Sequence, residues 1–414
     1  MKAQKMTDNP SVSQKQMHSA FMAGVAAADP HAAVLRALSD GAFMVPEGRI
    51  FVLAIGKAAS AMMQAALGVL PKPHAALVVT NYENAGQVTG ARVLAAGHPV
   101  PDENGLQAGL AVQKMLARTT REDAVLVLVS GGGSALVPAP VPGVTLEQKA
   151  EVNRLLLGAG LDITQMNLVR QHLSRLKGGG LLRTAAPAPV TALILSDVVG
   201  DDLRVIASGP TVAPIGTRAQ AMRLLEDAGL WGQVPDTVRT VLRAETEARA
   251  LPEAANHLVG SNAQSVAAVT RALPDAQSDP TPLVGDVAEA AARIVAMANR
   301  PGVTVLGGET TVALRGTGLG GRNQELALRV ALTLQGQAGW RFLSGGTDGR
   351  DGPTDAAGAV VDGGTVARIQ AAGGDAQALL ANNDSYAALQ LAGDLLVTGG
   401  TGTNVADLQI LAVD

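Results

Sequence analysis

The stretch AVLVLVSGGGSAL (residues 124–136) decides the fold class, because it joins an unbroken apolar run directly to a glycine-rich turn. The run Ala124–Val129 shows no alternation of apolar and polar residues, which is typical of a parallel strand covered by helices on both faces. Apolar runs that end in small polar turns recur at Gly56-Lys57, Ser196-Asp197, Gly307-Gly308-Glu309, Gly345-Gly346-Thr347 and Gly399-Gly400. We therefore predict an α/β fold in which several strands end in turns that can approach a ligand closely.

Helical patterns alternate with these strands almost throughout the chain. They cover Ala58–Leu70, Asn104–Arg118, Leu146–Leu157, Thr217–Ala228, Ala263–Leu273, Asp286–Ala298 and Gln324–Leu334. This alternation predicts α/β layers with mainly parallel sheets. At 414 residues the chain is too long for one ordinary core. We predict a loose tail over residues 1–16, a Rossmann-like domain with helices on both faces of its sheet over 17–250, and a smaller α/β domain over 251–414.

Composition excludes several classes of protein. The net charge is −4 and aromatic residues make up only 2% of the chain, which argues against a nucleic-acid-binding surface. There is no cysteine, so disulfides and thiolate chemistry are excluded. No apolar run approaches the roughly 20 residues of a membrane span, and the polar residues 1–16 lack the apolar segment of a signal peptide. We expect a cytoplasmic protein that binds neither nucleic acid nor membrane.

Lys57 and the turn Gly131–Ser134 predict an anion site. Lys57 opens a predicted helix directly after a strand, where its charge adds to that of the helix N-terminus. Three successive glycines leave backbone N–H groups that can cradle a phosphate. A P-loop is excluded because Ala58 follows Lys57, and Ser134 lacks the G-x-S-x-G spacing of a nucleophile elbow. The alternatives are a solvated surface lysine and a purely structural turn.

Carboxylates follow the next buried strand. Asp197 lies nearest the end of that strand, and Asp201 and Asp202 come shortly after it. Mg²⁺ prefers oxygen ligands and commonly takes one or two carboxylates together with substrate phosphates. We therefore assign a metal site to Asp197 and Asp201, whereas Asp202 fits a helix cap better. His98 in a glycine–proline turn and Ser208 in the turn SGPT are expected to be structural.

The stretch GTGLGGRNQE (residues 316–325) contains a G-x-G-x-x-G sequence followed by Arg322. A dinucleotide fingerprint also needs an acidic residue about 20 positions on, at the end of the next strand. Residues 336–346 contain none, so we reject a dinucleotide-binding motif here. The loop instead delivers Arg322 to the start of a helix, where a guanidinium suits phosphate or carboxylate. The structural alternative is a salt bridge from Arg322 to Glu325 or Glu309.

A series of motifs occurs in the order of one known family. They are GKAA (56–59), GHPVPD (97–102), SGGGSAL (130–136), LSDVVGD (195–201), IASGPT (206–211), GGETTV (307–312), GGRNQE (320–325), SGGTDG (344–349) and VTGGTGTN (397–404). The set resembles the type II glycerate 2-kinases, whose C-terminal half is called the MOFRL domain. Homologues in tartrate-utilisation clusters are often labelled hydroxypyruvate reductase. The resemblance covers nearly the whole chain from about residue 17.

The resemblance implies two α/β domains with the active site in the cleft between them. It also implies ATP-dependent phosphorylation of the 2-hydroxyl of D-glycerate, with Lys57 and Arg322 as the catalytic positive charges. Phosphoryl transfer needs positioning and charge stabilisation more than covalent chemistry, which agrees with the residues themselves. We expect Lys57 and Arg322 to clamp the transferred phosphoryl group, Asp197 to act as base, and Mg²⁺ to bind at Asp197 and Asp201.

The remaining expected ligand contacts come from the glycine turns. The residues predicted to bind ATP are Gly131, Gly132, Gly133, Ser134, Gly308, Glu309, Thr310, Gly345, Gly346 and Asp348. An NAD(P)H-dependent hydroxypyruvate reductase is the second hypothesis, and the failed dinucleotide fingerprint disfavours it. A non-catalytic sensor of nucleotide or organic acid ranks third, because a sensor does not need Lys57 and Arg322. A homodimer is a possible assembly.

Overall fold

The computed structural model describes residues 12–245 and 250–414, which form two compact units. We call Pro30–Val259 the N-terminal unit, and Gly260–Asp414 together with residues 12–29 the C-terminal unit. The predicted boundary near residue 250 lies shortly before this division. Most of the predicted loose tail, residues 1–11, lies outside the described residues.

The first helix belongs to the C-terminal unit, which differs from the predicted domain over 17–250. Helix α1 (Gln14–Ala27) is capped by Ser13, and it packs against α11 (Asn262–Ala272). Its buried residues, Phe21 among them, join the core of the C-terminal unit. A Cβ on Gly24 would lie 2.6 Å from Val269, so the glycine permits the close approach of the two helices. Sequence periodicity alone did not show which sheet this helix would cover.

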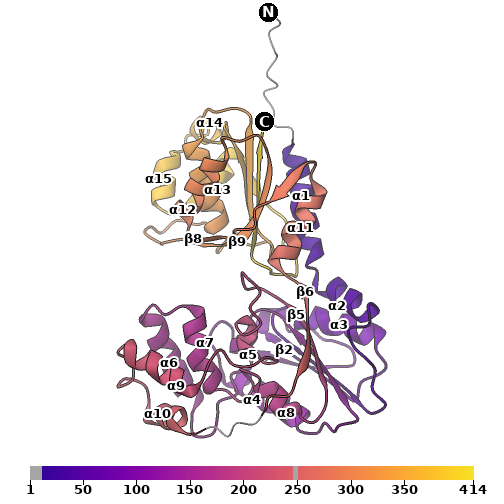
Figure 1. Ribbon diagram of the computed structural model, residues 1–414. Helices are drawn as coiled ribbons and strands as arrows, with labels where there is room; N and C mark the ends of the chain where they lie inside the picture. Colours follow the sequence, from indigo (N-terminus) through magenta and orange to yellow (C-terminus); the bar gives the residue numbers. More distant parts are fainter. Residues whose placement is uncertain (1–11, 246–249) are drawn as a thin grey trace, which may run out of the picture. The chain divides into compact units, whose positions relative to one another are not determined.

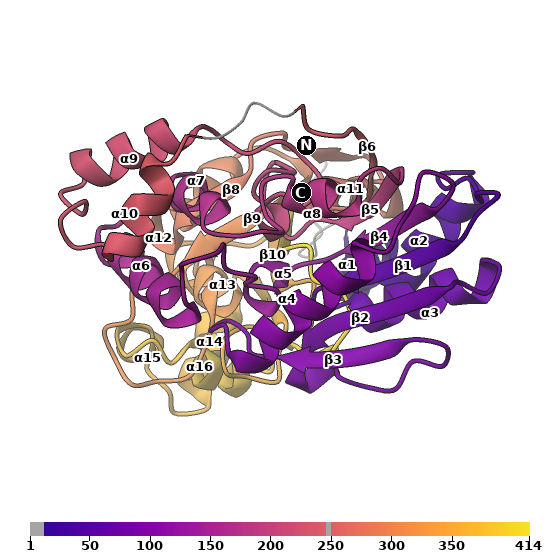
Figure 2. The same cartoon turned by 90° about the horizontal axis from the view of Figure 1, so that it is seen from below.

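The N-terminal unit is built on a six-stranded sheet with the order β3-β2-β1-β4-β5-β6. Its strands are β1 (Ile50–Ile55), β2 (Ala75–Asn81), β3 (Arg92–Ala96), β4 (Ala124–Val129), β5 (Val190–Leu195) and β6 (Ala254–Gly260). Strand β1 pairs in parallel with β2 and β4, β2 with β3, and β4 with β5. Figure 2 shows β1, β2 and β3 side by side. Every residue of β1 and β4 is buried, as their unbroken apolar runs predict.

Helices cover this sheet and also form a separate layer. They are α2 (Pro30–Ser39), α3 (Ala59–Val69), α4 (Glu103–Leu116), α5 (Gly133–Leu136), α6 (Leu146–Gly158), α7 (Ile163–His172), α8 (Gly180–Ala185), α9 (Arg218–Asp227) and α10 (Asp236–Arg243), with the 3₁₀ turns η1 (Tyr82–Asn84) and η2 (Ile206–Ser208). Helices α6, α7, α9 and α10 share a small core of their own (Figure 1). The side chains that face the sheet are therefore separate from those that hold this helical layer together.

The C-terminal unit has a mixed sheet with the order β12-β11-β10-β13-β9-β7, and β8 pairs with β9. Its strands are β7 (Ala276–Ser278), β8 (Leu283–Asp286), β9 (Gly302–Thr311), β10 (Trp340–Gly346), β11 (Gly358–Asp362), β12 (Leu395–Leu396) and β13 (Asp407–Val413). The pairs β10–β11, β10–β13, β11–β12 and β9–β13 are antiparallel. The prediction of a mainly parallel sheet is therefore wrong for this unit. Apolar runs covered on both faces do not reveal strand direction.

Both faces of the C-terminal sheet are covered by helices (Figure 1). On one face α1 and α11 pack against Val305, Leu343 and Ile410. On the other face, Leu306, Phe342 and Leu411 meet the remaining helices, which are α12 (Val287–Met297), α13 (Arg322–Thr333), α14 (Thr365–Ala371), α15 (Ala376–Ala381) and α16 (Ser385–Ala392). Among the described residues, none of the helices has the length and apolar character needed to cross a membrane.

Candidate active site

The carboxyl ends of β1 and β4 bring Lys57 and the Gly131–Ser134 turn together. These strands are neighbours at the point where the strand order reverses, which is where open α/β sheets bind ligands. The backbone N–H of Lys57 donates to the carbonyl of Gly131 at 2.9 Å, and that of Ala58 donates to Ser130 Oγ at 3.1 Å. Helix α3 starts at Ala59, two residues after Lys57, and has no side-chain cap. These contacts bring Lys57 and the glycine turn together, while their predicted roles in anion binding stay predictions.

Asp197 lies against the same turn. A Cβ on Gly131 would be 2.2 Å from Asp197 Oδ2, so only glycine leaves room for this carboxylate. Burial raises the pKa of Asp197, and the positive charge of Lys57 opposes that shift. His98 touches the turn at Gly132, and both its burial and the charge of Lys57 lower its pKa. Lys57, His98 and Asp197 thus share one electrostatic environment, although His98 was expected to be structural.

The predicted metal ligands are only partly supported by geometry. In residues 12–245 and 250–414, no group of three or more His, Asp or Glu side chains is arranged to hold a metal ion. Asp201 sits after β5 with a φ of 54°, a conformation uncommon for aspartate. Two carboxylates can nevertheless suffice for Mg²⁺ when substrate phosphates supply other ligands. The assignment of Asp197 and Asp201 stays a prediction.

Ser134 is held by a chain of buried polar side chains that the sequence did not indicate. Its hydroxyl lies 2.6 Å from Ser208 Oγ, and Ser208 donates to Asn167 Oδ1 at 3.0 Å. Ser208 therefore does more than form a rigid turn. Ala207 and Ser208 have φ values of 49° and 60°, a costly left-handed conformation for residues with a Cβ. Such strain is typical of functional sites, and here it places the Ser208 hydroxyl between two helices.

Three basic residues next to these hydrogen-bonded side chains were also missed in the sequence analysis. They are Lys149 of α6, Arg170 of α7 and Lys177, which follows α7. Their sequence neighbourhoods look like ordinary amphipathic helices, in which lysine and arginine usually face solvent. A weak signal was available in the stretch SRLKGGG (residues 174–180), where a lysine precedes three glycines.

Gly131→Ala tests whether the position of Asp197 matters for activity. The three atoms nearest to the new Cβ all belong to the Asp197 side chain and none to the backbone, so the protein should fold while this side chain moves by about 1 Å. A displacement of that size can cost on the order of 10²-fold in turnover. We expect a loss of that order, measured as kcat, with a thermal midpoint close to that of the parent.

Gly158→Ala is the matched control for this substitution. Gly158 lies in α6, and a Cβ there has nothing within 4 Å. Its kcat should stay at the parent value. If Gly131→Ala also keeps full turnover, the placement of Asp197 against the turn has no bearing on the reaction.

In the C-terminal unit, Arg322 is bound by two carboxylates. Its Nε donates to Asp407 Oδ2 at 2.6 Å and its Nη2 to Asp407 Oδ1 at 2.9 Å, while Nη1 lies 3.0 Å from Glu309 Oε1. Burial acts to lower the pKa of Arg322, but hydrogen bonds and charge from Asp407 raise it overall. The salt bridge to Glu309, weighed as an alternative, is present, whereas Glu325 pairs with Arg329. Asp407 was not predicted.

The N-terminus of α13 already has an internal anion. The Asp351 carboxylate accepts hydrogen bonds from the N–H groups of Asn323 and Gln324 at 3.1 Å and 2.8 Å. Burial raises the pKa of Asp351 to about 6. The preceding glycine loop is also satisfied internally, because its N–H groups donate to Asn382, Asn383 and Asp384. This loop is thus an internally bonded support for Arg322, in agreement with the rejection of a dinucleotide motif.

Several glycines predicted to bind ATP also take part in close packing within the C-terminal unit. Gly308 lies within β9, where a Cβ would be 2.2 Å from the Leu283 carbonyl oxygen of β8. The N–H of Gly346 donates to Ala357, and a Cβ on Gly345 would press on Phe21. These glycines allow close packing of neighbouring elements. Thr310 is buried in β9, Glu309 is exposed beside Arg322, and Asp348 is half-buried after β10.

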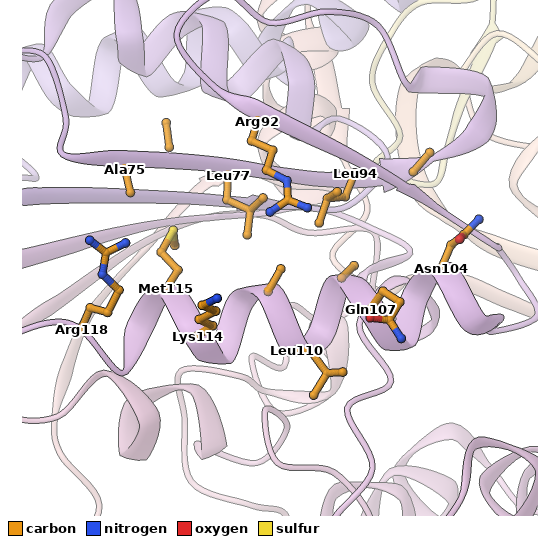
Figure 3. A pocket seen from close by; sticks show the side chains of 14 residues that line it. Ala75, Leu77, Arg92, Leu94, Asn104, Gln107, Leu110, Lys114, Met115 and Arg118 are labelled. Atoms are coloured by element: carbon orange, nitrogen blue, oxygen red, sulfur yellow. The ribbon is translucent and has the colours of Figure 1, made fainter.

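A separate groove of about 590 Å³ runs along α4 in the N-terminal unit. Figure 3 shows Lys114 and Met115 of α4, and Arg118 just beyond its C-terminal end, on one side of this groove, with Arg92 and Leu94 of β3 on the other. None of the predicted site residues lines it. It lies beside the sheet and not at the strand ends where Lys57 and Asp197 are found.

Comparison with known proteins adds sequence and structural relatives. The family model described as "Domain of unknown function (DUF4147)" matches residues 16–243, and the one described as "MOFRL family" matches residues 302–407. A D-glycerate 2-kinase from Thermotoga maritima is 41% identical over 379 residues, which cover 87% of this chain and 90% of that protein. A protein from Agrobacterium vitis is 38% identical over 99% of this chain and 96% of its own, and carries the provisional name of a hydroxypyruvate reductase.

The fold has a solved counterpart. A crystal structure of a glycerate kinase from Thermotoga maritima matches this chain with a TM-score of 0.90 and 38% identity, covering 97% of this chain and 99% of that one. The prediction of two α/β domains, the first Rossmann-like, is confirmed by this match and by the strand order.

Proposed function

This chain belongs to the glycerate kinase family that carries DUF4147 and MOFRL domains, and from that premise we propose that it is a D-glycerate 2-kinase. It transfers the γ-phosphoryl group of ATP to the 2-hydroxyl of D-glycerate and releases 2-phosphoglycerate and ADP. The observation that carries the proposal is the position of Lys57, the Gly131–Ser134 turn and Asp197 at one end of the N-terminal sheet.

The chemistry of that group suits phosphoryl transfer. A positive charge at the start of a helix and a turn of glycines offer stabilisation for a phosphoryl group whose charge increases during transfer. The Asp197 carboxylate has a raised pKa because of its burial, which makes it a stronger base toward the substrate hydroxyl. Water exclusion is favoured by the apolar strands behind the site, whose residues are fully buried.

ATP and Mg²⁺ are the cofactors of this proposal. The residues Lys57, Gly131–Gly133 and Ser134 would bind phosphates, and the carboxylates of Asp197 and Asp201 would hold the metal. Bound Mg²⁺ supplies charge neutralisation of the phosphates. Arg322 would contribute a second cation to the same reaction. Its hydrogen bonds to Asp407 fix its guanidinium in one orientation before any ligand arrives.

The reductase hypothesis is less well supported. The sheet has the strand order of dinucleotide-binding proteins, but the turn after β1 reads Gly56-Lys57-Ala58-Ala59 and lacks the glycine fingerprint. Strand β2 ends at Asn81, where such proteins carry an acidic residue for the ribose. A lysine at the β1 turn suits phosphate better than it suits hydride transfer.

One pair of assays separates the two functions. Purified protein with ATP, Mg²⁺ and D-glycerate should form 2-phosphoglycerate, identified by phosphorus NMR, which also distinguishes the 2- from the 3-isomer. The same preparation should not consume NADH or NADPH when hydroxypyruvate is supplied. Oxidation of NADH with hydroxypyruvate, and no phosphoglycerate from ATP, would overturn the kinase proposal in favour of a reductase.

A further inference from the structure

A group of basic side chains, one buried and two half-buried, lies beside the Gly131–Ser134 turn. We call Lys149, Arg170 and Lys177 the cation cluster. Lys177 is only 7% exposed, and in the described parts of the chain no carboxylate pairs with any of the three. Burial lowers the pKa of all three, and the neighbouring positive charges lower the pKa of the two lysines further. Each lysine therefore has at least one positive neighbour and no negative counterpart.

Backbone contacts tie the cluster to the proposed active site. The Lys149 ammonium donates to the Pro138 carbonyl at 2.5 Å, two residues beyond the short helix that follows the glycine turn. The N–H of Gly178, next to Lys177, donates to the Ser208 carbonyl at 3.1 Å. Ser208 in turn holds Ser134 through its hydroxyl. The cluster and the glycine turn thus border one region of the N-terminal unit.

Asn167 supplies a second, independent sign of a missing partner. It is 1% exposed, and its Oδ1 accepts from Ser208. Its Nδ2 has no hydrogen-bond partner among the described residues. Buried polar atoms in native proteins are nearly always paired, so an orphaned amide donor beside cations indicates an absent acceptor.

We infer that the cation cluster and Asn167 form an oxyanion-binding subsite for one of the reactants. Its ligand is either the phosphate chain of the nucleotide or the carboxylate of the acceptor. Arginine and lysine differ in geometry, and together they give a fork and a compact point charge that suit several oxyanion oxygens at once. The assignment to a reactant rests on the proposed function, whereas the oxyanion chemistry rests on the contacts alone.

A structural role and a ligand-binding role for Lys177 predict opposite changes in stability when this lysine is replaced. A buried cation that stabilises a fold is normally paired with a carboxylate. Removing that cation leaves the carboxylate buried without a partner, which destabilises the protein. An unpaired buried cation destabilises the ligand-free protein instead. Lys177→Met should therefore melt at or above the parent temperature without ligand. A clear drop in the melting temperature would overturn the inference.

Binding measurements identify the ligand. Calorimetric titrations with pyrophosphate, ADP and D-glycerate should be run on the parent, Lys177→Gln, Lys177→Arg and the exposed control Lys72→Gln. Lys177→Gln should weaken at least one ligand by about 10- to 100-fold, the range for a lost hydrogen bond to a charged group. Lys177→Arg should recover part of the loss, and Lys72→Gln should bind like the parent.

Comparing the three ligands shows whether the subsite binds the phosphate chain or the carboxylate. A loss confined to ADP and pyrophosphate assigns the subsite to the phosphate chain, and a loss confined to D-glycerate assigns it to the carboxylate. Unchanged affinity for all three ligands overturns the inference. The assay measures binding and needs no turnover, so it tests the subsite separately from the kinase activity. If the parent protein is an active kinase and Lys177→Gln binds all three ligands normally, the proposed function stands and the subsite is refuted.

Proton uptake gives a readout that packing changes do not produce. The pKa of Lys177 is lowered to about 7, so at about pH 8 its amine is mostly neutral before binding. The charge whose field acts on Lys177 is that of Arg170, and burial together with the charges of Lys177 and Arg170 lowers the pKa of the nearby Lys149 as well. A bound oxyanion favours the ammonium form, so binding should take up a proton. Titration in buffers of different ionisation enthalpy should show this uptake in the parent and less of it in Lys177→Gln.

Discussion

Lys57→Ala should lower kcat by about 10²- to 10³-fold, the loss seen when one donor to a transition-state charge is removed. Lys57 is the only charged side chain in the turn that follows β1, and its field reaches both Asp197 and His98. It forms no ion pair within the described residues, so its removal breaks no salt bridge. The melting temperature should therefore stay near the parent value. Initial rates of ADP formation at saturating ATP and D-glycerate measure the effect.

Two further variants make the Lys57 result interpretable. Lys72→Ala removes an exposed lysine from the same unit and should leave kcat unchanged. Lys57→Arg keeps the charge but replaces a compact ammonium with a planar fork, and should restore only part of the activity. Parent-like turnover in Lys57→Ala would show that this lysine is an ordinary surface residue. A loss seen only in KM would assign Lys57 to substrate binding and not to the transferring group.

The N-terminal half of the candidate site could be predicted because its signals are local. An apolar run that ends in a glycine turn places the turn at the carboxyl end of a strand, whatever the rest of the chain does. Lys57, Gly131 and Asp197 all follow such runs directly, so the parallel pairing of β1, β4 and β5 brings them to the same edge.

The residues that were missed depend on contacts between distant segments. Lys177 and Asn167 lie in helical sequence with no special spacing, and their importance appears only when burial leaves them unpaired. Asp351 and Asp407 follow the same rule, because they meet Arg322 and its helix from other strands and loops. Gly308 and Gly345 were predicted from local sequence alone, and their ligand contacts stay a prediction. Both glycines lie in close packing that their local sequence does not reveal, Gly308 against Leu283 of β8 and Gly345 against Phe21 of α1.

Arg322 requires a design that separates catalysis from stability. Asp407 is 1% exposed, so Arg322→Met alone leaves a buried carboxylate without its partner. Such a change costs about 3–5 kcal/mol of folding free energy. A loss of activity in this variant would then have two explanations. The double variant Arg322→Met/Asp407→Asn removes the stranded charge and should recover much of the lost stability in thermal or denaturant unfolding.

The expected result is that stability returns in the double variant and turnover does not. If Arg322 stabilises the transferred phosphoryl group, kcat should stay at least about 10²-fold below the parent in both the single and the double variant. The matched control is Arg368→Met/Asp394→Asn, which breaks a similar partly buried pair in the same unit and should keep parent turnover. If turnover of the Arg322 double variant rises together with its stability, Arg322 is a structural partner of Asp407, and Lys57 alone supplies the cation for the transfer.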